Sequence, residues 1–413
     1  MGMGKPHSLR AIQSGHWPSL MGAWLHFEVS FMVWILIGAL GIAIADEFSL
    51  SATEKGLLVS VPLLGGALLR ILVGPLADQF GAKTVGLYVL GVETLALFLG
   101  WRWSTSYEAI LGIGLLLGAA GSSFAIALPI ASQAYPPQHQ GLAMGVAAVG
   151  NSGVLLASFF APRVAQAAGW HNTFGFMLVP VLLTICLFSL IVQPSKGPQP
   201  FPRSKESSVN VRGLLRQAIG QRYLYWLCFL YAVTFGGFVG LSSFLPIFFH
   251  DQYQITMVTA GTMTALCALS GSLARPIGGH LADRFGGTVL LQVVFLLLGL
   301  CCIALGYLLA PQMALPLLIL TLGLLGFGNG VVFQVVSIRF RRVMGTASGL
   351  IGAAGGLGGF LLPFWFGVLK DTIGSFAAGF WVLGGVAVLA GVSVIMVQRS
   401  VPLPSPGSVL DGG

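Results

Sequence analysis

The sequence predicts an all-α integral membrane protein whose twelve transmembrane helices form two related halves of six. Hydrophobic residues make up 56% of its 413 residues, and charged residues only 8%. Soluble domains carry about 25% charged residues, so this composition indicates a chain built for the lipid bilayer. Twelve apolar runs are long enough to span it. They must cross as helices, because the bilayer core offers no water to the backbone.

The apolar runs also predict how the chain is divided. The expected spans cover about residues 24–45, 56–77, 84–101, 109–133, 142–162, 170–193, 223–249, 256–279, 288–309, 313–338, 345–369 and 375–397. We therefore expect two six-helix bundles, at 24–193 and 223–397, joined by a cytoplasmic linker at 194–222 that is rich in proline, serine and basic residues. Cytoplasmic tails are expected at 1–23 and 398–413.

A stretch that occurs twice relates the two halves. LLRILVGPLADQFGAK ends the second span, and LARPIGGHLADRFGGT ends the eighth. At one constant offset Arg70 matches Arg275 and Asp78 matches Asp283, and in each copy about 12 Å of helix separates the arginine from the aspartate. Because the aspartate marks the polar end of its span, both guanidinium groups are expected near the midplane of a hydrocarbon core about 30 Å thick.

The net charge of +8 reflects topology more than an anionic macromolecular partner. If the N-terminus is cytoplasmic, most of the 20 lysine and arginine residues fall in segments that face the cytoplasm. The outer loops hold only Lys55, Arg102, Arg163 and Lys370. This bias predicts a multi-pass protein of the cell inner (plasma) membrane with both termini in the cytoplasm, and it argues against nucleic acid as a partner.

Nothing in the sequence indicates an enzyme, a metal site or a cofactor. The five cysteines lie inside apolar runs without metal-ligand spacing, so we interpret them as buried small hydrophobic residues. No expected span carries a histidine at mid-depth, and no cysteine pairs with one. Residues 1–23 lack the compact apolar region and cleavage site of a signal peptide.

Two carboxylates lie within the expected spans. Glu28, beside His26, is within a turn or two of the cytoplasmic end of the first span. It is either a wetted helix end or a proton-binding group that can be reached from the cytoplasm. Glu93 lies in the middle of the third span, where a carboxylate costs about 2.5–3.5 kcal/mol on insertion scales. A local hydrogen bond, a protonated carboxyl and a role in coupling remain alternatives for Glu93.

The repeated stretch resembles the signature loop of the major facilitator superfamily, which follows the second span and recurs after the eighth. Glycines there let the chain turn sharply, and Asp78 can accept hydrogen bonds from a neighbouring helix end. The motif residues are Gly74, Asp78, Gly81, Gly279, Asp283 and Gly286. The resemblance implies two pseudo-symmetric six-helix bundles, a substrate site at their interface near the midplane, and alternating access by rocking.

Glycine-rich runs in the fifth and eleventh spans make the resemblance more specific. The first run contains Gly150, Asn151 and Gly153; the second contains Gly352, Gly355 and Gly356 without the asparagine. Each glycine weakens a helix by about 1 kcal/mol relative to alanine, so close packing and hinging during rocking must offset it. With the two arginines, these runs resemble the nitrate/nitrite porter family, which implies that Asn151 binds substrate.

Aromatic residues at related places in the two halves are further candidates for the site. Phe124 in the fourth span and Phe333 in the tenth each lie three residues after a glycine, Gly121 and Gly330, and such residues either pack or line a site. Tyr231 and Phe235 lie one turn apart in the seventh span and face the same side. The resemblance implies that Phe124 and Phe235 face each other across the substrate, with Tyr231 close by.

Two neutral polar residues lie near Phe333 in the tenth span. Gln334 is included with Phe333 among the substrate-binding candidates. Asn329 is interpreted as a hydrogen bond between helices.

The two intramembrane arginines predict an anionic substrate. At a separation of about 8 Å and an effective dielectric constant of about 20, Arg70 and Arg275 would repel each other by about 2 kcal/mol. No carboxylate occupies a comparable place in the second, fourth, fifth, seventh, eighth, tenth or eleventh span. Guanidinium forks and aromatic faces suit a flat oxyanion better than tetrahedral phosphate or sulfate. The step from a flat anion to nitrate or nitrite rests on the resemblance.

Several alternatives stay open from the sequence. If the empty site is too positive to reorient, the protein exchanges nitrate for nitrite. If a proton accompanies the anion, net uptake becomes possible. The stretch FEVSFMVWILIGALG, which is similar to importer-like members, favours this symport with Glu28 as the proton site.

Other classes of protein remain alternatives. A transporter of organic or phosphate anions would also bind its substrate with two arginines but would need more polar donors. An anion sensor would need a signalling domain. A monomer is expected.

Overall fold

The computed structural model describes residues 15–136, 139–193, 219–340 and 344–400, and within these ranges the regular structure is helical. Twelve helices or helix pairs are long and apolar enough to cross a membrane, as predicted. The helices are, in order, α2 (Trp17–Phe48), α3 (Ala52–Phe80), α4 (Ala82–Arg102), α5 (Tyr107–Leu117), η1 (Gly118–Ser123), α6 (Phe124–Gln133), α7 (Gln140–Ala148), η3 (Val149–Ser152), α8 (Gly153–Ala168), α9 (Trp170–Ile191), α11 (Arg222–Tyr253), α12 (Met257–Phe285), α13 (Gly287–Leu305), α14 (Pro311–Arg339), α15 (Met344–Ile373) and α16 (Ala377–Ser400).

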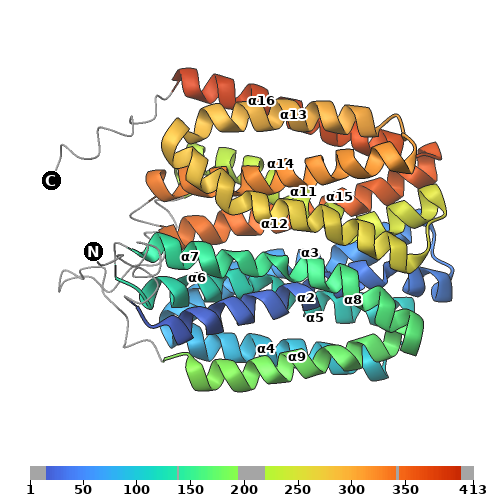
Figure 1. The fold of residues 1–413 in the computed structure, drawn as a ribbon, viewed down its shortest axis with the longest axis horizontal. Helices are drawn as coiled ribbons and strands as arrows, with labels where there is room; N and C mark the ends of the chain where they lie inside the picture. Colours follow the sequence, from blue (N-terminus) through green and yellow to red (C-terminus); the bar gives the residue numbers. More distant parts are fainter. Residues whose placement is uncertain (1–14, 137–138, 194–218, 341–343, 401–413) are drawn as a thin grey trace, which may run out of the picture.

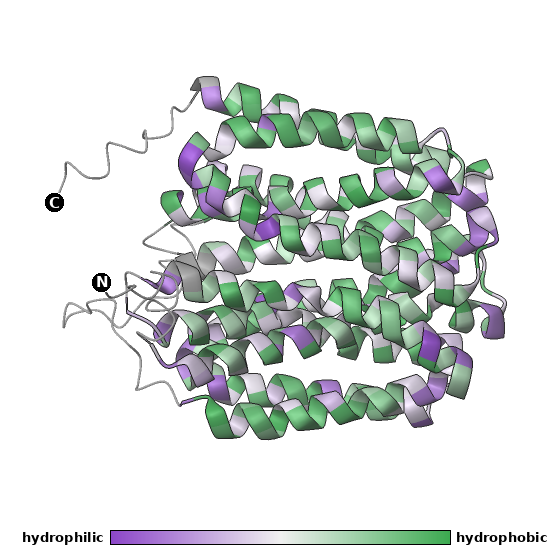
Figure 2. Ribbon diagram, in the orientation of Figure 1, coloured by the Kyte–Doolittle hydropathy of each residue, from purple (hydrophilic) through white to green (hydrophobic). Residues whose placement is uncertain are grey.

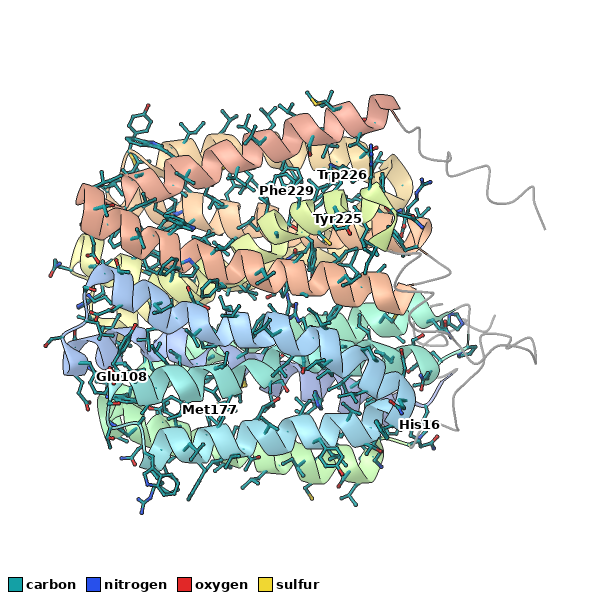
Figure 3. The ribbon with its side chains drawn as sticks, turned by 180° about the vertical axis from the view of Figure 1, so that it is seen from behind. His16, Glu108, Met177, Tyr225, Trp226 and Phe229 are labelled. Carbon is teal, nitrogen blue, oxygen red and sulfur yellow. The ribbon has the colours of Figure 1, made fainter. Side chains whose placement is uncertain are left out.

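Figure 1 shows the helices in two stacked halves, α2–α9 and α11–α16, that lie side by side along their length. Both described ends of the chain, at Gly15 and Ser400, lie at the same end of the molecule, which we call the termini end. Hydrophilic residues gather at this end and at the opposite end, with an apolar zone between them (Figure 2). His16 and Glu108 mark the two ends in Figure 3.

The outward-facing side chains of this zone suit lipid. Apolar residues such as Val179, Leu296 and Leu389 are about two-thirds exposed, with relative accessibilities of 64%, 60% and 64%. They lie on the peripheral helices α9, α13 and α16. Uncompensated exposure of this kind is not stable in water, so the chain is a multi-pass membrane protein.

The central helices of each half are α2 and α11, which are buried over most of their length. They pack against each other across the interface between the halves. Two further pairs join the halves, α3 with α15 and α8 with α12. The interface is therefore built from six helices, and it includes the two that carry Arg70 and Arg275.

The repeated stretch forms helix over most of its length, which corrects the expectation of a short loop. α3 continues through Gly74 and Asp78 to Phe80, and a single residue, Gly81, turns the chain into α4. Gly81 has φ = 87° and Gly286, its repeat mate, has φ = 85°. These left-handed conformations favour glycine because a Cβ would clash with the backbone.

The first helix begins earlier than expected, at Trp17, within the segment interpreted as a polar tail. The His16 side chain accepts a hydrogen bond from the backbone N–H of Ser19, and Pro18 lies in the first turn, where it is well tolerated. Most of the expected linker (194–218 of 194–222) and the larger part of both tails (1–14 and 401–413) lie outside the described residues.

The fourth and fifth spans are interrupted at mid-depth, but their counterparts α14 and α15 are continuous. The 3₁₀ segment η1 separates α5 from α6, and η3 separates α7 from α8. Small residues predominate in them, with GAAGSS in η1 and VGNS in η3, since a tighter helix brings side chains into eclipse and tolerates small residues best. The chain thus loses regular α-helical geometry next to the arginines in one half only.

The pair α3–α15 shows where the halves touch. A Cβ built on Gly56 would meet the Pro363 carbonyl oxygen at 2.4 Å, and one built on Gly356 would meet Ala67 at 2.8 Å. About two turns nearer the termini end, on the same faces of α3 and α15, Cβ atoms on Gly74 and Gly349 would meet no described residue within 4 Å. The helices therefore pack from the opposite end as far as the arginines and diverge towards the termini end.

Polar contacts hold the opposite end closed. Lys55 of α3 and Asp251 of α11 form a salt bridge of 2.8 Å. Asp371 of α15 accepts hydrogen bonds from the backbone N–H groups of Ala52 and Thr53, at 3.2 and 2.7 Å. The first N–H groups of a helix lack intrahelical partners, so Asp371 caps a helix of the other half.

We predict that Asp371→Ala opens this end more often. Caps contribute about 1 kcal/mol, so the ratio of open to closed molecules should rise about fivefold. Distances between spin labels on the ends of α3 and α15, in a cysteine-free background, measure the ratio. Glu108→Ala removes an exposed carboxylate at the same end and serves as the control. Identical distance distributions for Asp371→Ala and wild type would contradict the assignment of this cap.

Candidate functional site

Arg70 is buried at the interface and uses backbone oxygens, not carboxylates, as partners. Its Nε donates to the Gly121 carbonyl of η1 at 2.6 Å, and its Nη1 donates to the Gly352 carbonyl of α15 at 3.0 Å. Its Cζ lies 5.0 Å from the ring centroid of Trp34 and 4.8 Å from that of Phe235. Nη2 is buried and has no partner among the described residues. One donor group of Arg70 therefore remains available.

Arg275 occupies the equivalent place on α12. It is buried, and its Cζ lies 5.4 Å from the ring centroid of Phe124. The Tyr231 side chain interacts with it, and the two arginines are close enough to repel each other. Its Nη1 has no hydrogen-bond partner in the part of the chain that the structure describes. The two halves thus present two cations whose donor groups are not used up.

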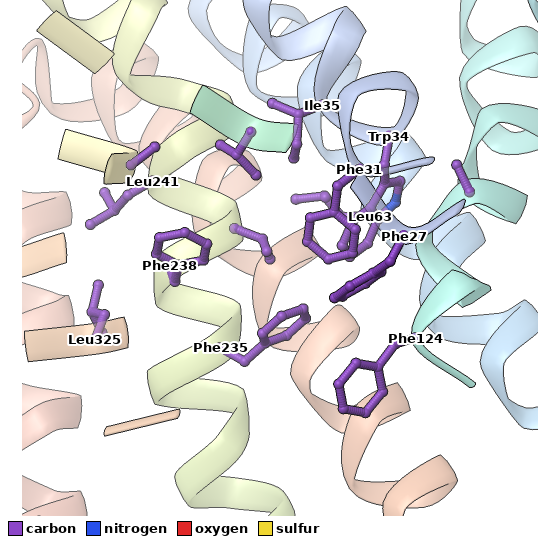
Figure 4. Packing of buried hydrophobic residues seen from close by; sticks show 14 of the residues in the cluster. Phe27, Phe31, Trp34, Ile35, Leu63, Phe124, Phe235, Phe238, Leu241 and Leu325 are labelled. Carbon is purple, nitrogen blue, oxygen red and sulfur yellow. The ribbon is translucent and has the colours of Figure 1, made fainter. Parts of the chain in front are cut away.

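Seven aromatic rings form a closed circuit around the arginines, which we call the aromatic cage. Its members are Phe27, Phe31, Trp34, Phe124, Tyr231, Phe235 and Phe333. Neighbouring ring centroids around the circuit are 4.6 to 6.2 Å apart. Five of these residues appear in Figure 4, where they line the space between α2 and α11.

The predicted aromatic residues all belong to this cage, and along its circuit Phe124 and Phe235 are separated by two rings on one side and by three rings of α2 on the other. Tyr231 stacks on Phe235, with centroids 5.0 Å apart and ring planes 3° apart. Phe333 meets the edges or faces of Phe124 and Tyr231 at 5.3 and 5.0 Å. Phe333 and Tyr231 therefore link Phe124 to Phe235 along one side of the circuit.

Three cage residues were missed by the sequence reasoning, namely Phe27, Phe31 and Trp34 of α2. Their i, i+4, i+7 spacing places them on one helix face, and this spacing was the available signal. Trp34 is fixed by a hydrogen bond from its Nε1 to the Pro62 carbonyl at 2.8 Å. It is also held between glycines, because a Cβ on Gly66 or Gly121 would meet the indole at 2.8 or 2.5 Å.

The glycine runs pack against the same region. In η3 and α8, a Cβ on Gly150 would meet Phe27 at 2.8 Å, and one on Gly153 would meet the Glu28 carbonyl oxygen at 2.1 Å. In α15, Gly352 lies next to the Arg70 side chain, and a Cβ on Gly355 would meet the Tyr231 ring at 2.6 Å. The missing side chains let α2 and α11 approach the arginines closely.

Asn151 is a buried amide with no partner. It lies in η3, which packs against both α2 and α12. Neither its Nδ2 nor its Oδ1 has a hydrogen-bond partner among the residues that are described. A buried unsatisfied amide costs about 1–3 kcal/mol, so its presence in a segment that packs on α12, the helix of Arg275, suits a site that is completed by a ligand.

The two intramembrane carboxylates lie on different faces of the N-terminal half. Glu28 is buried and accepts a hydrogen bond of 2.7 Å from the Ser152 hydroxyl, directly after Asn151. Glu93 is fully buried and accepts a hydrogen bond of 2.8 Å from Ser30. The local hydrogen bond that was one alternative for Glu93 is therefore present. Glu28 thus contacts η3, whereas Glu93 contacts α2.

Some candidates are not brought to the cage. The Gln334 amide oxygen lies against the start of α13, 2.9 Å from a Cβ built on Gly287, which is away from the arginines. The motif residues Gly74, Gly81 and Gly286 lie in open space, where a Cβ would meet no described residue within 4 Å. The remaining motif residues, Asp78, Gly279 and Asp283, lie near the termini ends of α3 and α12. No group of histidine, cysteine or acidic residues within the described ranges could hold a metal ion.

Comparisons with known proteins place this architecture in a family. The profile of the Major Facilitator Superfamily matches residues 23–363. The probable nitrate/nitrite transporter NarK2 of Mycobacterium tuberculosis (strain ATCC 25618 / H37Rv) is 33% identical over 376 residues, which cover 90% of this chain and 93% of that protein. The chain belongs to the nitrate/nitrite porter family of the major facilitator superfamily. It is therefore a transporter and not an enzyme.

Two other relatives support this membership, and one solved structure shares the fold. The nitrite extrusion protein of Bacillus subtilis (strain 168) is 32% identical over 380 residues, covering 90% of this chain and 92% of that protein. The probable nitrate/nitrite antiporter NarK1 of Thermus thermophilus is 30% identical over 407 residues, covering 91% and 90%. A bacterial homolog of the human lysosomal transporter Spinster, in an inward-facing and occupied conformation, has a TM-score of 0.69 at 16% identity and covers 92% of this chain and 96% of its own. This porter thus has the major facilitator fold with two pseudo-symmetric six-helix bundles.

We predict that Gly153→Ala destabilises this porter by about 1–3 kcal/mol, because the new methyl group would overlap backbone atoms of α2, which cannot move aside. Gly145→Ala is the matched control, since a Cβ there would meet no described residue within 4 Å and alanine favours helix. Thermal unfolding in detergent measures both variants. Equal unfolding temperatures for the two would refute the close packing of η3 and α8 on α2.

Proposed function

We propose that this protein is a secondary active transporter of nitrate and nitrite that works by alternating access, with the anion held between Arg70 and Arg275. The observation that carries the proposal is the surplus of buried donors at the cage. Arg70 Nη2, Arg275 Nη1 and Asn151 Nδ2 all lack partners among the described residues. The names of the relatives, which include nitrate/nitrite transporters and a nitrite extrusion protein, agree with such a substrate.

The cage favours a flat, singly charged anion. Each arginine lies against one or two aromatic faces, and such faces leave a thin space beside the guanidinium plane. A planar anion can accept paired hydrogen bonds from a guanidinium fork without thickening the stack. Tetrahedral phosphate and bulky organic anions would need the rings to separate. Competition by phosphate esters tests that alternative directly.

The contacts between the halves suggest how access alternates. The halves are in contact from the arginines to the opposite end and diverge towards the termini end, so one side is closed while the other opens. An anion that bridges Arg70 and Arg275 would offset the repulsion between two cations in different halves. Neutralised in this way, the loaded site can pass through a closed state, which the empty site resists.

We propose that nitrate enters together with a proton carried by Glu28. Its carboxylate accepts a hydrogen bond from Ser152 of η3, the segment that also carries Asn151, a proposed ligand of the anion. Loss or gain of the proton can therefore reposition a ligand of the anion. Nitrate/nitrite antiport is the alternative, and it agrees with the name of the Thermus thermophilus relative, a probable nitrate/nitrite antiporter.

The distribution of basic residues supports a plasma-membrane protein with cytoplasmic termini. In that orientation the diverging termini end faces the cytoplasm, and the structure corresponds to an inward-facing arrangement. We propose that one chain is sufficient, because a monomer contains both arginines and the whole aromatic cage.

We predict that Arg70→Lys and Arg275→Lys each reduce nitrate transport at least about tenfold. Lysine keeps the charge but loses the planar fork, and a hydrogen bond to a charged group is worth about 1.5–3 kcal/mol. Counterflow of labelled nitrate in proteoliposomes, with nitrite present or absent inside, measures the loss and separates exchange from net uptake. Arg102→Lys changes an exposed arginine and should transport normally. Normal counterflow by the Arg70 and Arg275 variants would refute the two-arginine site.

We predict that Glu28→Gln abolishes nitrate accumulation driven by a pH gradient but leaves nitrate/nitrite exchange intact. Glutamine can still accept the Ser152 hydrogen bond but cannot release a proton. Uptake into vesicles with and without an imposed pH gradient tests this expectation, with Glu93→Gln assayed in parallel. Accumulation that survives in Glu28→Gln would remove Glu28 from coupling, and its loss only in Glu93→Gln would assign the proton to Glu93.

A further inference from the structure

A second buried amide in the C-terminal half has no partner. Asn329 of α14 is fully buried, and neither its Nδ2 nor its Oδ1 meets a hydrogen-bond partner in the described part of the chain. A side chain that bonds two helices together would satisfy at least one of these atoms. The interpretation of Asn329 as a bond between helices is therefore not supported, and the amide needs another explanation.

The packing of α14 shows where Asn329 points. One face of α14 lies on α11, where a Cβ on Gly328 would meet Thr234 at 2.8 Å. Another face lies on α12, where a Cβ on Gly330 would meet the Arg275 carbonyl oxygen at 2.0 Å. Successive residues are about 100° apart around a helix, so Asn329 projects between these two faces. Its direction is into the space that α11 and α12 enclose.

Phe333 lies in nearly the same direction, one helical turn away. Its ring contacts Phe124 and Tyr231 of the aromatic cage. Asn329 thus lies directly beside the cage, one turn from Phe333 towards the closed end and level with Arg275. The same helix segment positions the backbone of Arg275 and the amide.

The repeat shows that the amide is particular to this half. Phe124 and Phe333 correspond, so the counterpart of Asn329 is Ala120. In the glycine runs the relation is reversed, because Asn151 of the N-terminal half corresponds to Ala353. Each half therefore contributes one arginine and one unpartnered buried amide, although the amides come from helices that the repeat does not equate.

We propose that Asn329 is a ligand of the transported anion, with Nδ2 donating to an anion oxygen on the closed side of Phe333. This inference rests on the proposed function. Each bundle then carries one guanidinium and one amide, and the anion keeps a charge-assisted donor and a neutral donor when the bundles separate on either side. Binding from both sides of the membrane follows, as alternating access requires.

The test compares Asn329→Leu, which keeps the branched shape and the number of heavy atoms but removes the donors, with Asn329→Asp, which adds a negative charge. Thr321→Val is the matched control, because Thr321 is buried on the same helix and its hydroxyl already donates to the Leu317 carbonyl. Nitrate KM and kcat are measured by uptake into proteoliposomes. Thermal unfolding in detergent is measured without nitrate, which reports folding, and with about 10 mM nitrate, a saturating concentration, which reports binding.

We expect Asn329→Leu to raise the nitrate KM about tenfold, with unfolding in the absence of nitrate unchanged and stabilisation by nitrate reduced. Asn329→Asp should lose transport, and Thr321→Val should resemble wild type. If Asn329→Leu keeps a KM within about twofold of wild type while Arg70→Lys fails, Asn329 is not a ligand and the proposed function stands. If wild type transports neither nitrate nor nitrite, the proposed function itself fails.

Discussion

Two guanidinium groups are buried where the halves of this porter meet, and among the described residues neither has a carboxylate partner. Burying even one unpaired charge is costly, so the surrounding structure must supply partial negative charge from other sources. It does so with carbonyl oxygens of Gly121 and Gly352 and with aromatic faces. These partners stabilise Arg70 without neutralising it, which leaves an anion as the missing charge.

The glycine runs follow from this arrangement. Carbonyl oxygens can reach Arg70 only if η1 and α15 approach α3 closely, and close approach requires residues without side chains at the contacts. Gly352 lies against Arg70 itself, and Gly355 leaves room for the Tyr231 ring. The helix propensity that these glycines lose is offset by packing that places the backbone next to a cation. The contact of Gly352 with Arg70 crosses between the halves, so it must break or slide when access alternates.

The two halves share a repeat but not the same local structure. The fourth and fifth spans are interrupted by 3₁₀ segments beside the site, whereas their counterparts α14 and α15 run unbroken. The amides differ in the same way, with Asn151 in a 3₁₀ segment and Asn329 in a regular helix. Pseudo-symmetry therefore supplies the two arginines, and local departures from it supply the neutral donors and a more deformable N-terminal half.

The sequence by itself determined the twelve spans and the division into related halves, and it predicted a mid-depth position for Arg70 and Arg275, because hydropathy and the repeat are properties of the linear chain. It also identified Phe124, Tyr231, Phe235 and Phe333, partly through family resemblance. Only the tertiary structure decided that Trp34 covers Arg70, that Gln334 turns away, that Asn329 has no partner and that the end opposite the termini is closed. Those features depend on how each helix is rotated against neighbours distant in sequence, and the pattern along one span does not specify that rotation.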